Sequence, residues 1–183
     1  QMTNTYQVPS SMLNGKDTTH KEANKIHNPF MRIATVQDAK QLATILREDD
    51  IAECKAHSNI GPEEALVVGV QLSHLPIGIF LNDNHCIAIV GVVPETKKVG
   101  RIWLLASDDL KLNLSYRFLK HCHKVCDLLN QSFPILYNHV DARNDLHIKW
   151  LKWMKFTFIN KVNEFGYEKK PFYEFIKICA HQR

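Results

Sequence analysis

The spacing of apolar residues along the chain is helical in its first half and becomes strand-like near Pro76. A short strand is expected over residues 31–34, and Thr35 is placed to cap a helix after it. In that helix apolar residues recur at intervals of three and four: Ala39, Leu42, Ile45 and Leu46. A second helix is predicted from Asp49 through Ala56, and Pro62 suits the first turn of a third that runs to about Leu72.

From Pro76 onward, runs rich in β-branched residues predict strands over 77–81 and 86–93, joined by an Asn-Asp-Asn turn, and a third strand over 101–106. A long helix is expected from about 109 to 130. Its predicted buried stripe is Leu112, Ser115, Leu119, Cys122, Cys126 and Leu129. A strand over 135–140, a helix over 145–155 and closing strands over 157–162 and 172–178 complete the chain. The helix over 145–155 is expected to bury Leu146, Trp150 and Trp153.

This order predicts an α/β fold with a mixed sheet: an antiparallel meander followed by a β-α-β-α-β-β segment, with helices on both faces. Residues 1–30 are polar and lack apolar periodicity, so we interpret them as a flexible N-terminal arm. Residues 31–183 are expected to form a single domain, because a chain of 183 residues with 45% hydrophobic content suits one substantial core.

Composition narrows the classes of function. No stretch of about eighteen apolar residues occurs, so no membrane span is predicted, and the polar N-terminus lacks a signal-peptide core. The five cysteines are odd in number and scattered, which favours reduced thiols in a cytosol-like compartment. Cys122 and Cys126 lie beside two histidines, but both fit the apolar face of their helix, so no metal site is predicted.

The formal net charge is only +4, which by itself is typical of a solvated surface. Lys149, Lys152 and Lys155 share one side of the predicted helix over 145–155. Nucleic-acid binding through this face therefore stays an alternative.

Residues 136–156 read as a strand, a polar loop and an amphipathic helix, with Asn144 twelve residues before Phe156. This spacing and the order of elements over 31–178 resemble the GNAT superfamily of acyl-CoA N-acyltransferases. The resemblance implies acetyl-CoA as a bound group, with residues 99–105 along its pantetheine arm and the amides of 108–111 at its phosphates. The residues it places at the cofactor are Leu104, Leu105, Ala106, Ser107 and Asn144.

The usual chemistry of that superfamily lacks its expected residues here. Residues 106–112 contain no glycine, and Asp108 and Asp109 stand where a pyrophosphate would bind, so that two carboxylates would repel it. As a helix start, the same acids are favourable. Leu151 occupies the position at which family members often carry a tyrosine general acid. No catalytic residue is therefore assigned.

A second resemblance uses the segments 103–107, 136–144, 150–153 and 171–175. Together they look like a family of small podophage proteins that includes the internal virion (assembly) protein of T7-like phages. This implies a role in virion assembly or inside the particle, with phage proteins as partners, in host cytoplasm or the virion; it does not establish an enzymatic activity. Together with the missing site residues, it leads us to expect a protein without standard acetyltransferase chemistry and without a cofactor. The alternative is an acyl-CoA-dependent N-acyltransferase with a modified phosphate loop.

The loop from Asp141 to Asn144 is the best candidate site, because it follows a strand at an edge where α/β proteins place ligands. A structural interpretation is equally concrete: Asn144 or Asp145 caps the helix, and Arg143 pairs with Asp141. His139 and His147 are candidates for a general base, or for buried structural residues.

Overall fold

The computed structural model describes residues 29–179, so the predicted arm over 1–30 lies almost wholly outside the described residues. The strands are β1 (Phe30–Ile33), β2 (His74–Asn82), β3 (His85–Pro94), β4 (Val99–Ala106), β5 (Ile135–Asp141), β6 (Thr157–Phe165) and β7 (Lys170–Ile178). The helices are α1 (Val36–Ala43), α2 (Glu48–Ser58), α3 (Pro62–Leu72), α4 (Asp108–Leu112), α5 (Tyr116–Ser132) and α6 (Asp145–Trp153).

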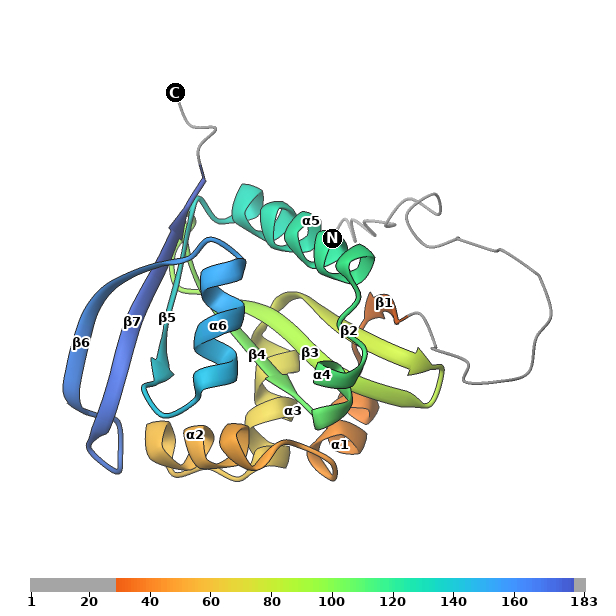
Figure 1. The fold of residues 1–183 in the computed structure, drawn as a ribbon, viewed down its shortest axis with the longest axis horizontal. Helices are drawn as coiled ribbons and strands as arrows, with labels where there is room; N and C mark the ends of the chain where they lie inside the picture. The colour runs from red at the N-terminus through yellow and green to blue at the C-terminus, as the bar shows by residue number, and fades with distance from the viewer. Residues whose placement is uncertain (1–28, 180–183) are drawn as a thin grey trace, which may run out of the picture.

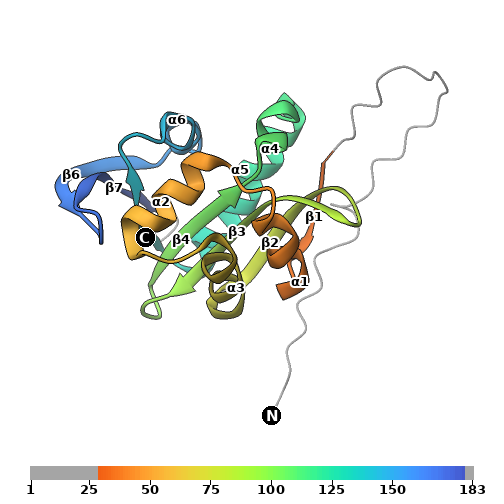
Figure 2. The same cartoon turned by 90° about the horizontal axis from the view of Figure 1, so that it is seen from below.

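One mixed sheet organises these elements, with strand order β1-β2-β3-β4-β5-β7-β6. Neighbouring strands are antiparallel except for β4 and β5, which are parallel. Helices α5 and α6 cover one face of the sheet, and α1, α2 and α3 cover the other (Figures 1 and 2). The predicted α/β fold with helices on both faces is confirmed.

Two apolar cores fill the spaces between these layers. Under α5 and α6, buried residues of the sheet pack against Phe118, Cys122, Leu129 and Leu151. Under α1 and α3, the sheet packs against Leu42 and Leu66. Because side chains alternate along each strand, β4 contributes to both cores.

The predicted long helix over 109–130 is wrong, because the chain leaves the helical path between α4 and α5. The Nδ2 of Asn113 donates to the carbonyl of Asp109 at 2.8 Å, and the hydroxyl of Ser115 accepts from the amide of Phe118 at 3.1 Å. Such local bonds make Asn and Ser good residues at helix ends and poor ones in the interior. Leu112, predicted to be buried, is 78% exposed, and Ser115 is the N-cap of α5.

The buried face of α6 also differs from the prediction, which placed Leu146, Trp150 and Trp153 inward. The helix instead buries His147 and Leu151, while Leu146 and Trp150 are only partly buried and Trp153 is 37% exposed. The ring of Trp153 lies against His123 of α5, with the ring centroids 4.1 Å apart.

Helix α6 ends in a Schellman motif. The amide of Phe156 donates to the carbonyl of Leu151, and that of Lys155 donates to the carbonyl of Lys152, both at 3.0 Å. A Schellman motif requires left-handed backbone at the residue that follows the C-cap. Lys155 occupies this position and has φ of 62°. A residue with a Cβ is disfavoured there by about 1–2 kcal/mol.

Replacing Lys155 with glycine is therefore expected to stabilise the protein. Relief of the left-handed strain exceeds the entropy that glycine adds to the unfolded chain, so the free energy of unfolding should rise by about 0.5–1 kcal/mol. Urea unfolding followed by circular dichroism measures this. The matched control, Lys152→Gly within α6, should lower the same free energy by about 1 kcal/mol. Equal destabilisation by both changes would contradict the motif.

Candidate functional site

Strands β4 and β5 pair over only three positions and then separate. The paired residues run from Val99 to Arg101 in β4 and from Ile135 to Tyr137 in β5. Just beyond them, the Nδ2 of Asn138 reaches across and donates to the carbonyl of Ile102 at 2.8 Å. This side-chain bond marks the closed end of a split in the sheet.

Two acidic residues of α2 bridge the open end of the split. Asp50 accepts from the amide of Ala106, at the end of β4, at 2.8 Å. Glu53 accepts from the amide of Asp141, at the end of β5, at 3.4 Å. The Nδ2 of Asn144 donates to both carboxylates, at 3.2 Å to Asp50 and 3.0 Å to Glu53.

Between these two bridges, the β4 edge faces the split without a partner strand. In an antiparallel pair, residues alternate between bonding toward the neighbour and away from it. Ile102 and Ala106 direct their peptide groups away from β3, as their bonds to Asn138 and Asp50 show. Leu104 lies midway between them and directs its amide and carbonyl the same way, so it is the position on this edge where a ligand can bond.

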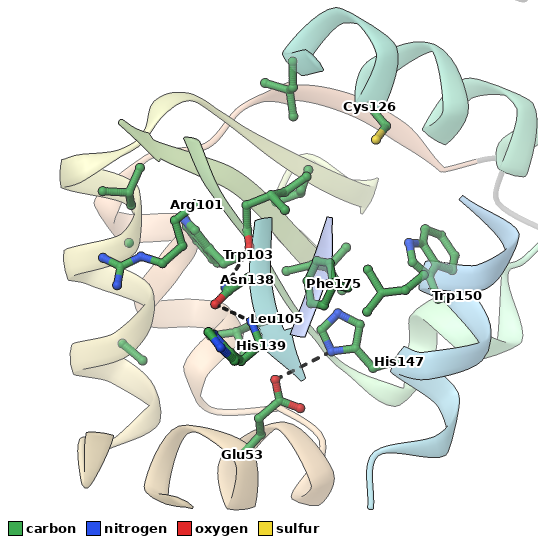
Figure 3. A pocket seen from close by; sticks show the side chains of 18 of the residues that line it. Glu53, Arg101, Trp103, Leu105, Cys126, Asn138, His139, His147, Trp150 and Phe175 are labelled. Carbon is green, nitrogen blue, oxygen red and sulfur yellow. Dashed lines mark hydrogen bonds and ion pairs between the residues drawn. The ribbon is translucent and has the colours of Figure 1, made fainter. Parts of the chain in front are cut away.

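A cavity of about 270 Å³ passes through the sheet at the split. On the α2 and α3 side its lining includes the polar groups of Glu53, His57, Arg101 and His139. On the α5 and α6 side the lining is apolar except for the imidazole of His147, with Cys126, Leu129, Leu151, Met154, Phe156 and Phe175. Figure 3 shows Arg101, Trp103 and His139 on one side of β5, with His147 and Trp150 on the other.

The environment of His139 keeps its imidazole neutral. Its ring stacks on Phe165 with the ring centroids 4.1 Å apart. Burial lowers the pKa of His139 below its ordinary value of 6.5, and Glu174 of β7 opposes this only in part. A neutral imidazole in a cavity wall is a competent general base at neutral pH.

His57 of α2 shares this side of the cavity. Burial and the positive charge of Arg101 lower the pKa of His57, although Glu53 opposes them. Its ring meets the edge of Phe165 at a centroid distance of 5.3 Å. Phe165 therefore packs against both histidines of this wall.

The thiols that line the cavity are unsuited to nucleophilic chemistry. Burial raises the pKa of Cys54 and Cys122 to about 12 and that of Cys126 to about 11. Each is therefore a neutral thiol at physiological pH, and thiolates are the nucleophilic form. A covalent acyl-cysteine route is disfavoured.

A buried group of charges lies behind the open end of the split. Arg47 and Asp50, 6% and 1% exposed, form an ion pair. Burial raises the pKa of Asp50, and the charges of Arg47 and His147 oppose this. Glu53 lies nearby, 14% exposed, with its Oε1 3.8 Å from the Nδ1 of His147.

The residues predicted to contact a cofactor lie around one end of the split. Leu104 and Leu105 line the cavity. The amide of Ala106 is bound by Asp50, and its carbonyl accepts from the amide of Arg47 at 3.0 Å. Ser107 is buried, and its amide and hydroxyl both donate to the carbonyl of Ile87. Their role toward a cofactor stays a prediction.

The loop from Asp141 to Asn144 has the contacts that the structural interpretation predicted. The Nε of Arg143 donates to Asp141 at 2.9 Å, and Asn144 caps α6 by accepting from the amide of His147 at 3.2 Å. Asn144 also bonds both acids of α2, which sequence reasoning missed. Asp50, Glu53 and His57 lie at three- and four-residue spacing on α2, a one-face pattern that was available as a signal.

The fit to coenzyme A is divided. An acyl thioester arm suits the narrow cavity and the bare edge at Leu104, whereas a diphosphate does not suit the start of α4. Asp108 and Asp109 occupy the first turn of this five-residue helix. His85 pairs with Asp109 at 2.9 Å, which leaves the carboxylate of Asp108 without such a partner in the part of the chain that the structure describes.

Acetyltransferases are among the solved structures similar to this chain. A GNAT-family acetyltransferase from Streptococcus pneumoniae has 14% identity and a TM-score of 0.58, over 83% of this chain and 99% of that one. The ribosomal-protein-S5-alanine acetyltransferase from Vibrio fischeri has 12% identity and a TM-score of 0.59, over 91% and 100%. Ard1 from Thermoplasma volcanium has 11% identity and a TM-score of 0.61, over 84% of this chain and 99% of that one.

The chain has the GNAT fold. At these identities the likeness establishes the architecture alone. No protein-family model matches the sequence, and no curated protein matches it either. The GNAT fold predicted over 31–178 is confirmed, whereas nothing found links the chain to phage virion proteins.

Two features of residues 29–179 bear on other classes of function. No helix there has the length and apolar character to cross a membrane. Nor do three or more His, Cys, Asp or Glu side chains come together as a metal site there. Lys149, Lys152 and Lys155 are exposed, and nucleic-acid binding by them stays a prediction.

The contacts of Asp50 with the end of β4 and with Arg47 predict a large loss of stability for Asp50→Ala. The change leaves the buried Arg47 unpaired and the amide of Ala106 without its acceptor, so the free energy of unfolding should fall by about 3–5 kcal/mol. Asp49→Ala, which removes an exposed acid next to it, should cost at most about 1 kcal/mol. Denaturant titration compares the two, and equal losses would contradict the bridge.

Proposed function

We propose that this protein transfers an acyl group from a coenzyme A thioester to an amine. The observation that carries the proposal is the cavity through the sheet at the split, with a neutral histidine in its polar wall and a largely apolar wall opposite. The similar solved structures support nitrogen as the acceptor, since they include a ribosomal-protein-S18-alanine N-acetyltransferase from Escherichia coli. The acyl donor is here a substrate.

The proposed reaction assigns the two faces of the sheet to the two substrates. The amine enters from the α2 and α3 side, where Glu53 provides a negative charge for a cationic acceptor. The thioester enters from the α5 and α6 side and bonds to the peptide groups of Leu104. The amine nitrogen attacks the thioester carbonyl carbon, a C–N bond forms and the C–S bond breaks. His139 accepts the proton that the amine loses, and the sulfur leaves as a thiol after gaining a proton.

His139→Gln tests the base. The variant should lower kcat/KM for acetyl-CoA and the best amine by about 10²- to 10³-fold, because the amine loses its proton acceptor. The wild-type rate should rise with pH as His139 loses its proton. That rise should be complete below neutral pH, because burial lowers the pKa of His139 more than the charge of Glu174 raises it. Another titratable group near His139 is His57, whose pKa is also lowered. Release of free thiol measures the rate.

The matched control is His121→Gln, which removes an exposed imidazole of α5 outside the cavity and should leave the rate unchanged. Absence of thiol release by the wild-type protein across a panel of primary amines, peptide N-termini and polyamines would overturn the proposed function. Equal rates for His139→Gln and the wild type would overturn only the role of His139.

Asp108→Asn tests the phosphate end of the donor site. Removing this charge should tighten the binding of acetyl-CoA by about fivefold at low salt, and the gain should shrink at high salt. Binding of acetyl-pantetheine, which lacks the nucleotide phosphates, should not change. Calorimetric titration measures both ligands. Glu164→Gln, a neutralisation on the distant edge strand β6, serves as the control. Unchanged acetyl-CoA affinity in Asp108→Asn would contradict this placement of the phosphates.

The role in phage assembly stays a separate prediction that rests on sequence resemblance. It concerns where the protein acts, in host cytoplasm or in the virion, and with which phage proteins. The sequence prediction paired that role with the absence of standard acetyltransferase chemistry, which is where it differs from the function proposed here. Mass spectrometry of purified particles would test it, and its outcome does not bear on the chemistry proposed for the cavity.

A further inference from the structure

His147 is a buried side chain whose hydrogen bonding is incomplete. The residue is 8% exposed, and its Nδ1 has no hydrogen-bond partner among the residues that the structure describes. The nearest acid is Glu53, at 3.8 Å, which is too long for a hydrogen bond and short enough for an ion pair. An unpartnered ring nitrogen inside a protein is costly, so its position calls for an explanation.

The ring lies where two cavities meet. Besides the main cavity, a small one of about 20 Å³ lies beside α4, α6 and the end of β4. Within residues 29–179, only Leu104, His147 and Trp150 line both of them. His147 therefore borders the bare edge of β4, on the side of the split where the donor is proposed to bind.

We propose that His147, held by Glu53, is the general acid that protonates the sulfur leaving from the acyl donor; this rests on the proposed function. As the C–S bond breaks, its electron pair stays on sulfur, and a ring nitrogen of the imidazolium transfers its proton there. The imidazole is left neutral, and the thiol departs. In one turnover His147 gives one proton to the sulfur and His139 takes one proton from the amine, so the number of protons on the protein does not change.

The placement of the two histidines suits this division of roles. Figure 3 shows His139 and His147 on opposite sides of β5, with Glu53 below them. An amine that approaches from one side and a thiol that leaves from the other need a base and an acid on those two sides. Leu151, one turn further along the buried face of α6, offers no proton to donate.

The charges around His147 favour its protonated form. Burial would lower the pKa of His147, but the carboxylates of Glu53 and Asp50 on α2 outweigh it. Arg47, from the connection before α2, acts in the opposite direction. The net pKa of His147 lies above 6.5, whereas that of His139 lies below it. Two titratable groups with pKa values moved apart in one cavity are typical of an acid and a base pair.

The experiment compares wild-type protein with His147→Gln and Glu53→Gln on two acetyl donors. One is acetyl-CoA, whose alkyl thiol needs a proton to leave; the other is an acetyl thioester of an acidic aromatic thiol, which does not. We expect His147→Gln to lower kcat by about 10²- to 10³-fold with acetyl-CoA and by only a few-fold with the aryl thioester. His123→Gln, outside both cavities, is the control and should match the wild type.

The pH profile distinguishes an acid from a structural residue. The wild-type kcat with acetyl-CoA should fall as pH rises through the pKa of His147, because the acid must carry its proton. This alkaline decline should vanish in His147→Gln and should move to lower pH in Glu53→Gln. Equal losses on both donors with an unchanged pH profile would overturn the proposal, even if His147→Gln is less stable.

Rates of the wild type and of His147→Gln distinguish a wrong assignment of the acid from a wrong assignment of the reaction. A kcat with acetyl-CoA that is equal in the wild type and in His147→Gln overturns the acid alone. No transfer by the wild type with either donor overturns both proposals. NMR titration of the His147 ring provides a readout without turnover: its midpoint should fall in Glu53→Gln, and an unchanged midpoint would also overturn the pairing.

Discussion

The separation of β4 from β5 is the constraint on which the rest of the site depends. Backbone amides and carbonyls inside a protein must be bonded, and a strand that loses its neighbour exposes a row of them. Here Asn138 satisfies this edge at one end and Asp50 at the other. Only the peptide groups of Leu104 remain between them, so the polar requirements of the split themselves define where an extended ligand can lie.

Helix α2 links the chemistry to this architecture. Its residues Asp50 and Glu53 bond the ends of β4 and β5 and also set the charge around His147. The same acids thus perform two tasks, closing the sheet and raising the pKa of the His147 imidazole. Because both acids belong to one helix, substitutions in α2 change the free energy of unfolding and the pKa of His147 together. Measurements of activity on such variants therefore need a parallel measurement of unfolding.

Sequence patterns were sufficient for most of the architecture, because apolar periodicity and turn residues are local. The strands, α3 and the capped start of α1 were found in this way. The break at Asn113 was missed, since apolar residues continue at helical spacing on either side of it. The site itself was only partly accessible: Asn144 was singled out, but its bonds to Asp50 and Glu53 join residues that are distant in the chain. No local pattern encodes such a contact.

The loop between β6 and β7 docks on the C-terminal end of α2. The amides of Tyr167 and Glu168 donate to the carbonyls of His57 and Ala56, and an added Cβ at Gly166 would come within 2.5 Å of the carbonyl oxygen of Ala56. Phe165, which packs on both histidines of the polar wall, belongs to the same hairpin. During synthesis, the N-terminal helices must therefore wait for the final hairpin to leave the ribosome before the acceptor side is complete. A chain cut short by premature termination would present an unfinished wall and would be a natural substrate for quality control.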